Sequence, residues 1–484
     1  MSDLDVKGKT ISGVLWKFAE RMGAQLVSLI VSIVLARMLT PNDYSVVGVV
    51  TIFFTFANVL ISGGLNTALI QKKDCEAEDY STVLYISLLM STLIYGVLFV
   101  IAPLIADLYK QQMLVVIIRV MGISLPITAL KSIWCAYISS NLLFKKFFFA
   151  TIGGTAVSAV VGIILAYHGA GAWALVAQQM TNSVIDTAIL IITTRVPLKH
   201  CISLKRFRGL FGYGWKVLVS SLVGTTYNEL VPMVIGVKYT GSDLSYYTKG
   251  RSFPHLISST TTSTFSSVLF PALAKYQNDK DKLLSYTRWF ISLSSFVTFP
   301  LMLGFLAVAD NFIIVVLTEK WLPAAPYIKI FCVACMFDVI HVGNCETIKA
   351  MGRSDVYLIM ELIKKSGYFI IIAVFLWLSN SPQVLAMAFL LCTLVAMVVN
   401  SIPNKRMIGY SFKDQLIDML PNVVTSSIMC ACVVAVGFIN VSSALKLVLQ
   451  ILTGIVVYLL VNIVIRNKNL VYLKNMLLER KKRK

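Results

Sequence analysis

Long apolar runs, separated by short polar segments, follow one another along the whole chain. Each run has about 18 residues or more, which is enough for an α-helix to cross the hydrocarbon core of a bilayer. Helices satisfy their own backbone hydrogen bonds, so such runs indicate membrane-spanning helices. The pattern predicts fourteen of them, at residues 11–39, 44–70, 80–108, 113–139, 147–168, 171–194, 209–237, 253–273, 286–309, 325–348, 356–378, 383–400, 416–438 and 443–465.

Lysine and arginine are distributed unequally between the connecting segments, and this sets the orientation. Segments on one side of the predicted membrane carry 28 of these residues and segments on the other side carry 7. Cytoplasmic loops of membrane proteins carry the excess of positive charge. Both termini are therefore predicted to be cytoplasmic, with the basic tail at 467–484 beside anionic lipid headgroups.

The composition excludes most other classes of protein. Of the 484 residues, 57% are hydrophobic and 14% are charged, whereas a soluble domain carries about 25% charged residues. The net charge of +20 lies largely in the predicted cytoplasmic segments, so we expect the bilayer and not nucleic acid as its partner. The nine cysteines lie mostly in apolar runs and are interpreted as packing residues.

Two stretches about 200 residues apart resemble each other. Trp16 and Trp215 each follow a glycine by three residues and precede a lysine, and Leu39–Asp43 resembles Tyr239–Asp243. The aspartate that ends each of these segments is expected to cap the next helix. Six predicted spans separate the two copies, so both have the same orientation, as in lobes related by an axis along the membrane normal. The predicted domains are an N-lobe at 1–200, a C-lobe at 201–408, two extra helices at 409–466 and the tail at 467–484.

Polar side chains recur at helical spacing inside several predicted spans. A charge in the middle of a spanning helix costs about 3 kcal/mol even on gentle scales, so most of them must face a wet or charge-paired interior. Lys17, Arg21 and Gln25 share one face of the first span, beside Glu20. The further candidates for a polar cavity lining or for ion coupling are Asn58, Asn66, Asp186, Asn228, Glu229, Asp338 and His341.

Cations outnumber acids inside the predicted spans, eight to six. A positive surplus in a cleft of low dielectric attracts an anionic substrate, and arginine can grip phosphate through two hydrogen bonds. The alternative interpretation, structural ion pairs between helices, stays open for any single residue. Asp338 and His341, three residues apart, form either a proton-carrying pair or a buried hydrogen-bonded one.

Several kinds of chemistry have no residues to support them. The chain has no Gly-x-x-x-x-Gly-Lys-Ser/Thr phosphate loop and no metal-binding spacing of His, Cys or Asp. The predicted spans leave no long extracytoplasmic loop for an active site. We therefore expect a transporter and not an enzyme, with no cofactor and no metal.

Five segments of the chain form recognisable motifs. They are Lys9-Thr-Ile-Ser-Gly-Val-Leu-Trp16, Glu20-Arg21-Met-Gly-Ala-Gln25, Leu35-Ala-Arg37-Met-Leu-Thr-Pro41, Gly212-Tyr-Gly-Trp215-Lys216 and Ala350-Met-Gly-Arg353-Ser-Asp355. These segments resemble the bacterial polysaccharide and O-antigen flippases (Wzx-like) of the multidrug/oligosaccharidyl-lipid/polysaccharide exporter superfamily. The resemblance covers nearly the whole chain.

The resemblance implies an all-α fold of two six-helix, MATE-like lobes with two extra C-terminal helices. It implies ion-coupled alternating access that moves an undecaprenyl-diphosphate-linked oligosaccharide across the bacterial inner membrane, with a glycan polymerase and chain-length machinery as further partners. A cationic cavity would hold the diphosphate or acidic sugars, and Asp186, Glu229 and Asp338 are the implied coupling candidates. The implied cationic residues are Arg21, Lys17, Arg119, Lys131 and Lys216.

Three alternatives belong to other classes. A drug or organic-cation exporter of the same superfamily should have a net acidic cavity, unlike the one predicted here. A twelve-helix sugar facilitator disagrees with the fourteen predicted spans. A non-transporting scaffold of an envelope-assembly complex predicts that the charges inside the spans are dispensable.

Overall fold

The computed structural model describes residues 3–62, 64–72, 75–199, 201–277, 279–378 and 380–472, and within these ranges the regular structure is helical, without strands. Two compact units divide the chain, Met1–Ser245 and Tyr246–Lys484. They are called unit 1 and unit 2 below, and each is described by itself. From residue 473 onward, the predicted basic tail lies outside the described residues.

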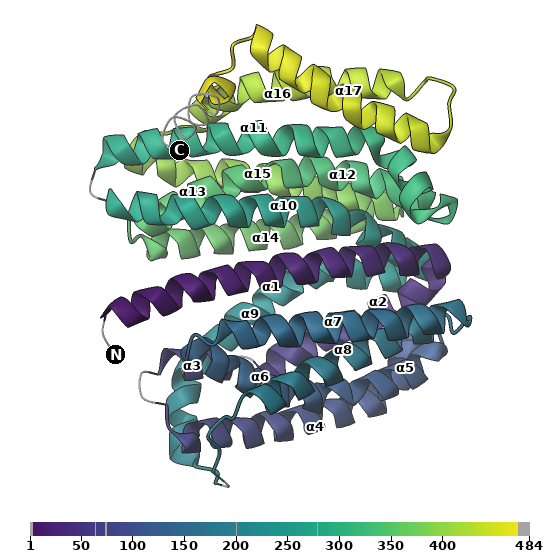
Figure 1. The fold of residues 1–484 in the computed structure, drawn as a ribbon, viewed down its shortest axis with the longest axis vertical. Coiled ribbons are helices and arrows are strands. Elements are labelled where there is room, and N and C mark those ends of the chain that lie inside the picture. The colour runs from purple at the N-terminus through teal and green to yellow at the C-terminus, as the bar shows by residue number, and fades with distance from the viewer. Residues whose placement is uncertain are drawn as a thin grey trace. The chain divides into compact units, whose positions relative to one another are not determined.

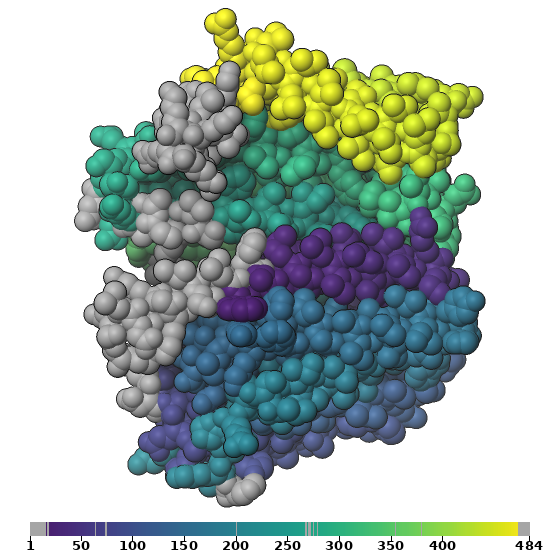
Figure 2. All heavy atoms as spheres, in the orientation of Figure 1, coloured from purple at the N-terminus to yellow at the C-terminus, as the bar shows by residue number. Residues whose placement is uncertain are grey.

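Unit 1 is a bundle of long helices (Figure 1). Within it, α7 packs between α1 and α8, α4 lies against α5 and α6, and α9 lies against α2, α3 and α4. Figure 2 shows α1, in purple, lying along α7. The helices are α1 (Asp3–Met38), α2 (Pro41–Ser62), α3 (Leu65–Gln71), α4 (Ala77–Leu108), α5 (Met113–Gly122), α6 (Ser124–Ser140), α7 (Phe144–Tyr167), α8 (Ala172–Thr193) and α9 (Leu204–Lys238).

Unit 2 is built around α11, which packs against α12, α13, α16 and α17, while α14 packs against α15. A π-helical turn at Ile313–Leu317 and a 3₁₀ segment at Glu319–Ala324 connect α11 to α12. The helices are α10 (Gly241–Lys275), which begins in unit 1, α11 (Lys280–Phe312), α12 (Ala325–Met336), α13 (Asp338–Ala350), α14 (Ser354–Leu378), α15 (Pro382–Ile408), α16 (Phe412–Val436) and α17 (Ser443–Val464).

The helices confirm an all-α polytopic membrane protein. Among the described residues, 11 helical segments are long and apolar enough to cross a membrane. Three further helices, α9, α10 and α14, also have membrane-spanning length, with 35, 35 and 25 residues, but are not among these segments. The predicted number of fourteen spans is therefore approximate.

Three of the predicted spans are broken, which the hydrophobic pattern did not indicate. The run at 44–70 is interrupted at Gly64, whose φ of 86° lies in the left-handed region that glycine adopts without strain. A Cβ atom there would lie 1.9 Å from the carbonyl oxygen of Gly214 in α9. The run at 113–139 breaks between α5 and α6, and the run at 325–348 breaks between α12 and α13.

The two segments that repeat in the sequence have the same local geometry. The Asp43 carboxylate accepts from the backbone N–H of Thr40 at 2.8 Å, and Asp243 accepts from the N–H of Thr240 at 3.1 Å. In return each threonine hydroxyl accepts from the backbone N–H of its aspartate, so both turns are reciprocal capping boxes. The expected capping role of the two aspartates is confirmed.

The compact units divide later in the chain than the predicted lobes at 1–200 and 201–408. Because α9 packs against α2, α3 and α4, it belongs to unit 1. The predicted lobe boundaries are drawn from the sequence repeat, and they stay a prediction.

Candidate functional site

A polar cavity of about 280 Å³ lies inside unit 1, between α2, α5, α6 and α8. Thr51, Thr55 and Asn58 reach it from α2, where their spacing puts them on one face of the helix. Its lining consists of Thr51, Phe54, Thr55, Asn58, Met121, Ser124, Thr128, Lys131, Gln179, Met180, Asn182 and Ser183. Hydroxyl and amide groups therefore surround one cation, Lys131.

The ammonium group of Lys131 is bound to the Asp186 carboxylate, which α8 presents beside the cavity. The side chain of Asp186 is 6% exposed and that of Lys131 is 33% exposed. Gly154 of α7 lies so close that a Cβ atom there would be 2.9 Å from the Cβ of Asp186. The pair therefore joins α6 to α8 at a place where α7 also approaches closely.

Three oxygen atoms at this place are buried and have no hydrogen-bond partner in the described part of the chain. They are the Oδ1 atoms of Asn58, Asn182 and Asp186. Buried acceptors in native proteins are normally satisfied, so hydroxyl donors from a ligand or from water would complete this site. The arrangement combines a cation with acceptors that suit hydroxyl groups.

The other cations predicted for a shared cavity are absent from the lining of this one or cannot be placed. The guanidinium carbon of Arg119 is 4.3 Å from the ring centre of Phe99, which gives a cation–π contact between α5 and α4. Arg21 on α1 and Lys216 on α9 have exposed side chains. The side chain of Lys17 lies outside the described residues.

The remaining predicted polar residues of unit 1 occupy several different positions. Glu20 accepts a hydrogen bond of 3.2 Å from Thr151, between α1 and α7. Gln25 is half-buried on α1, and Asn66 lies in the short helix α3. On α9, Asn228 is exposed and Glu229 is half-buried. Of the predicted lining, the structure thus brings together Asn58, Lys131 and Asp186.

In unit 2, Asp338 and His341 have different partners. Asp338 accepts a hydrogen bond of 2.5 Å from Ser258 of α10. His341 instead contacts the amide of Asn400 in α15 and lies 3.9 Å from the sulfur of Cys345. The two residues follow each other on α13 but belong to two separate clusters.

Two further cations inside the predicted spans are ion-paired. Lys329 binds Asp310 at 2.7 Å, and Lys364 binds Glu361 at 2.5 Å. Together with Lys131 they show that structural pairing accounts for part of the cation surplus. Glu361 lies three residues before Lys364 on the same helix, whereas Asp186 and Asp310 lie on other helices than Lys131 and Lys329, so spacing along one helix could not reveal those two partners.

An apolar cavity of about 630 Å³ lies between α11, α16 and α17 of unit 2. Pro300 and Gly304 of α11, Met429 of α16, and Gly454 and Tyr458 of α17 contribute to its walls. Gly304 and Gly454 leave the backbone of their helices open toward this space. The lining suits an apolar chain.

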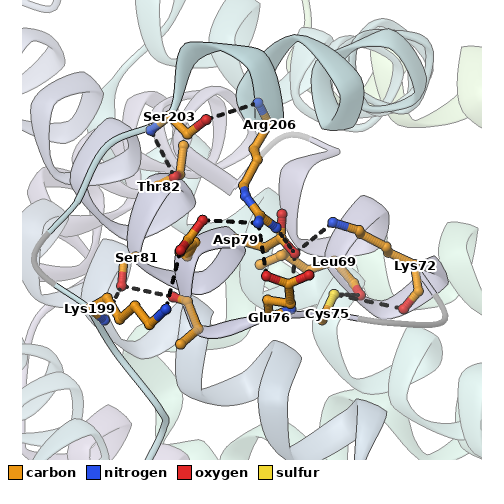
Figure 3. Close-up of polar contacts among 12 residues, drawn as sticks. Leu69, Lys72, Cys75, Glu76, Asp79, Ser81, Thr82, Lys199, Ser203 and Arg206 are labelled. Atoms are coloured by element: carbon orange, nitrogen blue, oxygen red, sulfur yellow. Dashed lines mark hydrogen bonds and ion pairs between the residues drawn. The ribbon is translucent and has the colours of Figure 1, made fainter.

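A charge network at the start of α4 was not anticipated from the sequence (Figure 3). Arg206, at the start of α9, binds Glu76 at 2.8 Å and Glu78 at 2.9 Å, and it reaches Asp79 at 3.3 Å. Lys72 also binds Asp79, at 2.6 Å. The hydrogen bonds to these carboxylates, above all to Glu76, raise the pKa of Arg206.

The same network holds the connector between α8 and α9. Lys199 binds Glu78 at 3.2 Å through its side chain, and its backbone N–H donates to Ser81 at 2.7 Å. Three cations face three carboxylates among these residues, so the network is charge-balanced and offers no surplus for an anion. The acidic run that begins α4 and the nearby Lys72 are its local signals in the sequence, whereas Lys199 and Arg206 lie about 120 to 130 residues later.

Solved structures with a similar fold include the lipid II flippase MurJ in an inward closed conformation. Its TM-score is 0.77 at 16% sequence identity, and the match covers 94% of this chain and 99% of that one. A multidrug resistance MATE transporter in an inward-facing conformation has a TM-score of 0.61 at 11% identity and covers 81% of this chain and 98% of its own. The prediction of a MATE-like fold is confirmed.

Relatives with known sequences span most of the chain. A membrane protein of the cps region of Klebsiella pneumoniae is 23% identical and covers 98% of each chain. The teichuronic acid biosynthesis protein TuaB of Bacillus subtilis is 22% identical over 93% of this chain and 94% of its own. The lipopolysaccharide biosynthesis protein WzxC of Escherichia coli is 22% identical over 73% of this chain and 72% of its own. The sequence profile of the polysaccharide biosynthesis protein family matches residues 34–326, more than half of the chain, which therefore belongs to this family.

Proposed function

We propose that this protein is a flippase that carries undecaprenyl-diphosphate-linked oligosaccharide units from the cytoplasmic to the periplasmic leaflet for surface polysaccharide biosynthesis. The family, the polysaccharide-related relatives and the MurJ-like fold support this function. The protein would act as a transporter and not as an enzyme. We place it in the bacterial inner membrane with both termini in the cytoplasm, as the positive-inside rule favours.

The polar cavity of unit 1 is the observation that carries the proposal. The substrate has a diphosphate, which needs a cation, and sugars, whose hydroxyls need acceptors. Lys131 supplies the positive charge, and Asn58 and Asn182 each hold a buried oxygen without a donor in the described structure. At about 280 Å³ the cavity admits part of the headgroup and not a whole oligosaccharide.

Binding and ion coupling can use the same ion pair. While Asp186 is ionised, it holds the ammonium group of Lys131 and competes with an incoming diphosphate. A coupling cation bound at Asp186 would offset the negative charge and leave the ammonium free for the substrate. Binding of the coupling ion at Asp186 and of the diphosphate at Lys131 would thus favour each other, as linkage between two sites requires.

Other parts of the lipid-linked substrate need other surfaces. The exposed side chains of Arg21 and Lys216 can approach an anion, whereas Arg119 is engaged by Phe99. The apolar cavity between α11, α16 and α17 is suited to part of the polyprenyl chain. A glycan polymerase and chain-length machinery would receive the translocated units.

Proteoliposomes loaded with a fluorescent lipid-linked oligosaccharide test the proposal through the sidedness of the label. Wild-type protein should move the label across the bilayer, and Lys131→Ala should reduce the rate at least about tenfold, since an ion-assisted hydrogen bond contributes about 1.5–3 kcal/mol. Lys131→Arg should retain part of the activity. Lys405→Ala, which changes an exposed lysine of α15, is the matched control and should transport normally.

A second result separates transport from coupling. Asp186→Asn should bind substrate but lose the dependence of transport on the gradient of the coupling ion. If wild-type protein moves no lipid-linked oligosaccharide but does move an organic cation, the exporter alternative replaces this proposal. If it moves neither while the cell still needs the protein for surface glycan, a scaffold role replaces it.

A further inference from the structure

Three side chains of different chemistry meet in unit 2, and the proposed function uses none of them. His341 and Cys345 lie one turn apart on α13, and Glu361 reaches them from α14. One ligand atom from each residue, a ring nitrogen, the sulfur and a carboxylate oxygen, lies within 4.8 Å of the other two. A combination of nitrogen, sulfur and oxygen donors at this separation is typical of a metal site.

A tetrahedral ion fits once the His341 ring turns its Nε2 toward the sulfur and the side chains close in. Zinc bonds of about 2.0–2.3 Å to these donors place tetrahedral ligand atoms about 3.3–3.6 Å apart. The Cys345 sulfur is already 3.9 Å from the ring nitrogens of His341. The side chain of Glu361 is long enough to close the remaining gap.

A buried amide supplies an independent indication. Asn400 of α15 is fully buried, its nitrogen contacts Nδ1 of His341, and its Oδ1 has no partner among the described residues. Turning the amide over exchanges its nitrogen and its oxygen. Oδ1 then accepts from Nδ1–H, which leaves the lone pair of Nε2 for a metal. Such an outer hydrogen bond orients nearly every histidine that binds a metal.

Charge also favours a divalent cation. A Cys345 thiolate and the Glu361 carboxylate together neutralise a divalent ion, and the neutral histidine adds no charge. Glu361 can give one oxygen to the metal and keep Lys364 on Oε1, where the distance is 2.5 Å. The side chain of Glu361 is 24% exposed, so an ion can reach the cluster, whereas Cys345 is 3% exposed.

We propose that His341, Cys345 and Glu361 form a binding site for Zn²⁺, with Asn400 orienting the histidine and water as the fourth ligand. The soft sulfur and the imidazole select zinc over magnesium or calcium, which prefer oxygen alone. Bound zinc joins α13 to α14. The site is separate from the cavity of unit 1 and does not depend on the proposed transport function.

Co²⁺ titration of the purified full-length protein tests the site, because a cobalt–thiolate bond gives a near-ultraviolet charge-transfer band. We expect one Co²⁺ per chain with this band, and its loss when Zn²⁺ is added. Cys345→Ser should abolish the band, and His341→Gln and Glu361→Gln should each weaken binding more than about tenfold. Asn400→Leu should weaken binding about 10- to 100-fold, as for other outer-shell partners.

Cys392→Ser is the matched control, because Cys392 is also buried, at 7% exposure, but lies in α15 outside the cluster. X-ray absorption of zinc-loaded wild-type protein should show one sulfur at about 2.3 Å, and this needs no variant to fold. The proposal is overturned if zinc has no sulfur ligand, if no thiolate band forms, or if Cys392→Ser removes the band as Cys345→Ser does.

Discussion

Replacing Lys131 by methionine leaves the carboxylate of Asp186 buried without its counter-charge. Removing one partner of a buried ion pair costs about 3–5 kcal/mol of unfolding free energy. Because Lys131 is 33% exposed, water weakens the pair, and we expect the lower end, about 3 kcal/mol. Asp186→Leu should cost less, about 1 kcal/mol, because the lysine left behind can turn its ammonium toward water.

The double variant shows whether the pair itself is responsible. Replacing both partners by apolar residues leaves no buried charge, so the combined cost should not exceed about 1 kcal/mol. The coupling energy between the two positions should then be about 3 kcal/mol. An uncoupled pair would instead show additive costs.

Unfolding of the purified variants in mixed micelles of detergent and sodium dodecyl sulfate measures these free energies. The exposed pair Lys329–Asp310, with side chains 40% and 52% exposed, is the matched control and should couple by less than about 1 kcal/mol. A coupling below about 0.5 kcal/mol between Lys131 and Asp186, or one no larger than that of the control, would refute the argument from burial.

Further predictions concern the helix break, the charge network and a helix end. Gly64→Ala should lower the unfolding free energy by at least about 2 kcal/mol, because the backbone of Gly64 is left-handed and a Cβ atom there meets Gly214. Gly96 has open space around it, so Gly96→Ala should not have this effect. Equal unfolding temperatures of the two variants would contradict this prediction. Arg206→Ala removes the links to three carboxylates and should make the connector before α9 sensitive to proteases; unchanged cleavage would count against the network. The first backbone N–H groups of α11 hold the pKa of the Asp279 carboxyl below its usual range. Asp279 therefore stabilises the folded protein above about pH 3.9, and this stabilisation is lost as the pH falls further. Asp279→Asn should remove that part of the pH dependence of the unfolding free energy, and an identical pH profile would disprove it.

The hydrophobic pattern predicted the helices well, because membrane length and side-chain periodicity are local properties. It did not predict where helices break. At Gly64 the break depends on the left-handed backbone and on the approach of Gly214, 150 positions later in the chain. Such a contact has no signature within either helix.

The candidate site was predicted in part for a related reason. Helical spacing made Asn58 and Asp186 candidates for an interior face, the family resemblance implied Lys131, and the structure brings these three together. Counting charges suggested a larger group of free cations. The rings of distant aromatic residues and the carboxylates of other helices take up several of them, as Phe99 does for Arg119, and helical spacing contains no information about such partners.

The two capped turns at Thr40–Asp43 and Thr240–Asp243 touch each other, through a hydrogen bond of 2.7 Å from the Ser242 hydroxyl to the Asn42 side chain. Asn42 and Ser242 hold the same place, the second residue of their helices. Corresponding positions of the two repeated segments thus lie against each other, so the two turns form one joint and a substitution at Asn42 or Ser242 reaches both caps. The threonine and aspartate that build each cap are the same in both segments, whereas the two residues between them differ.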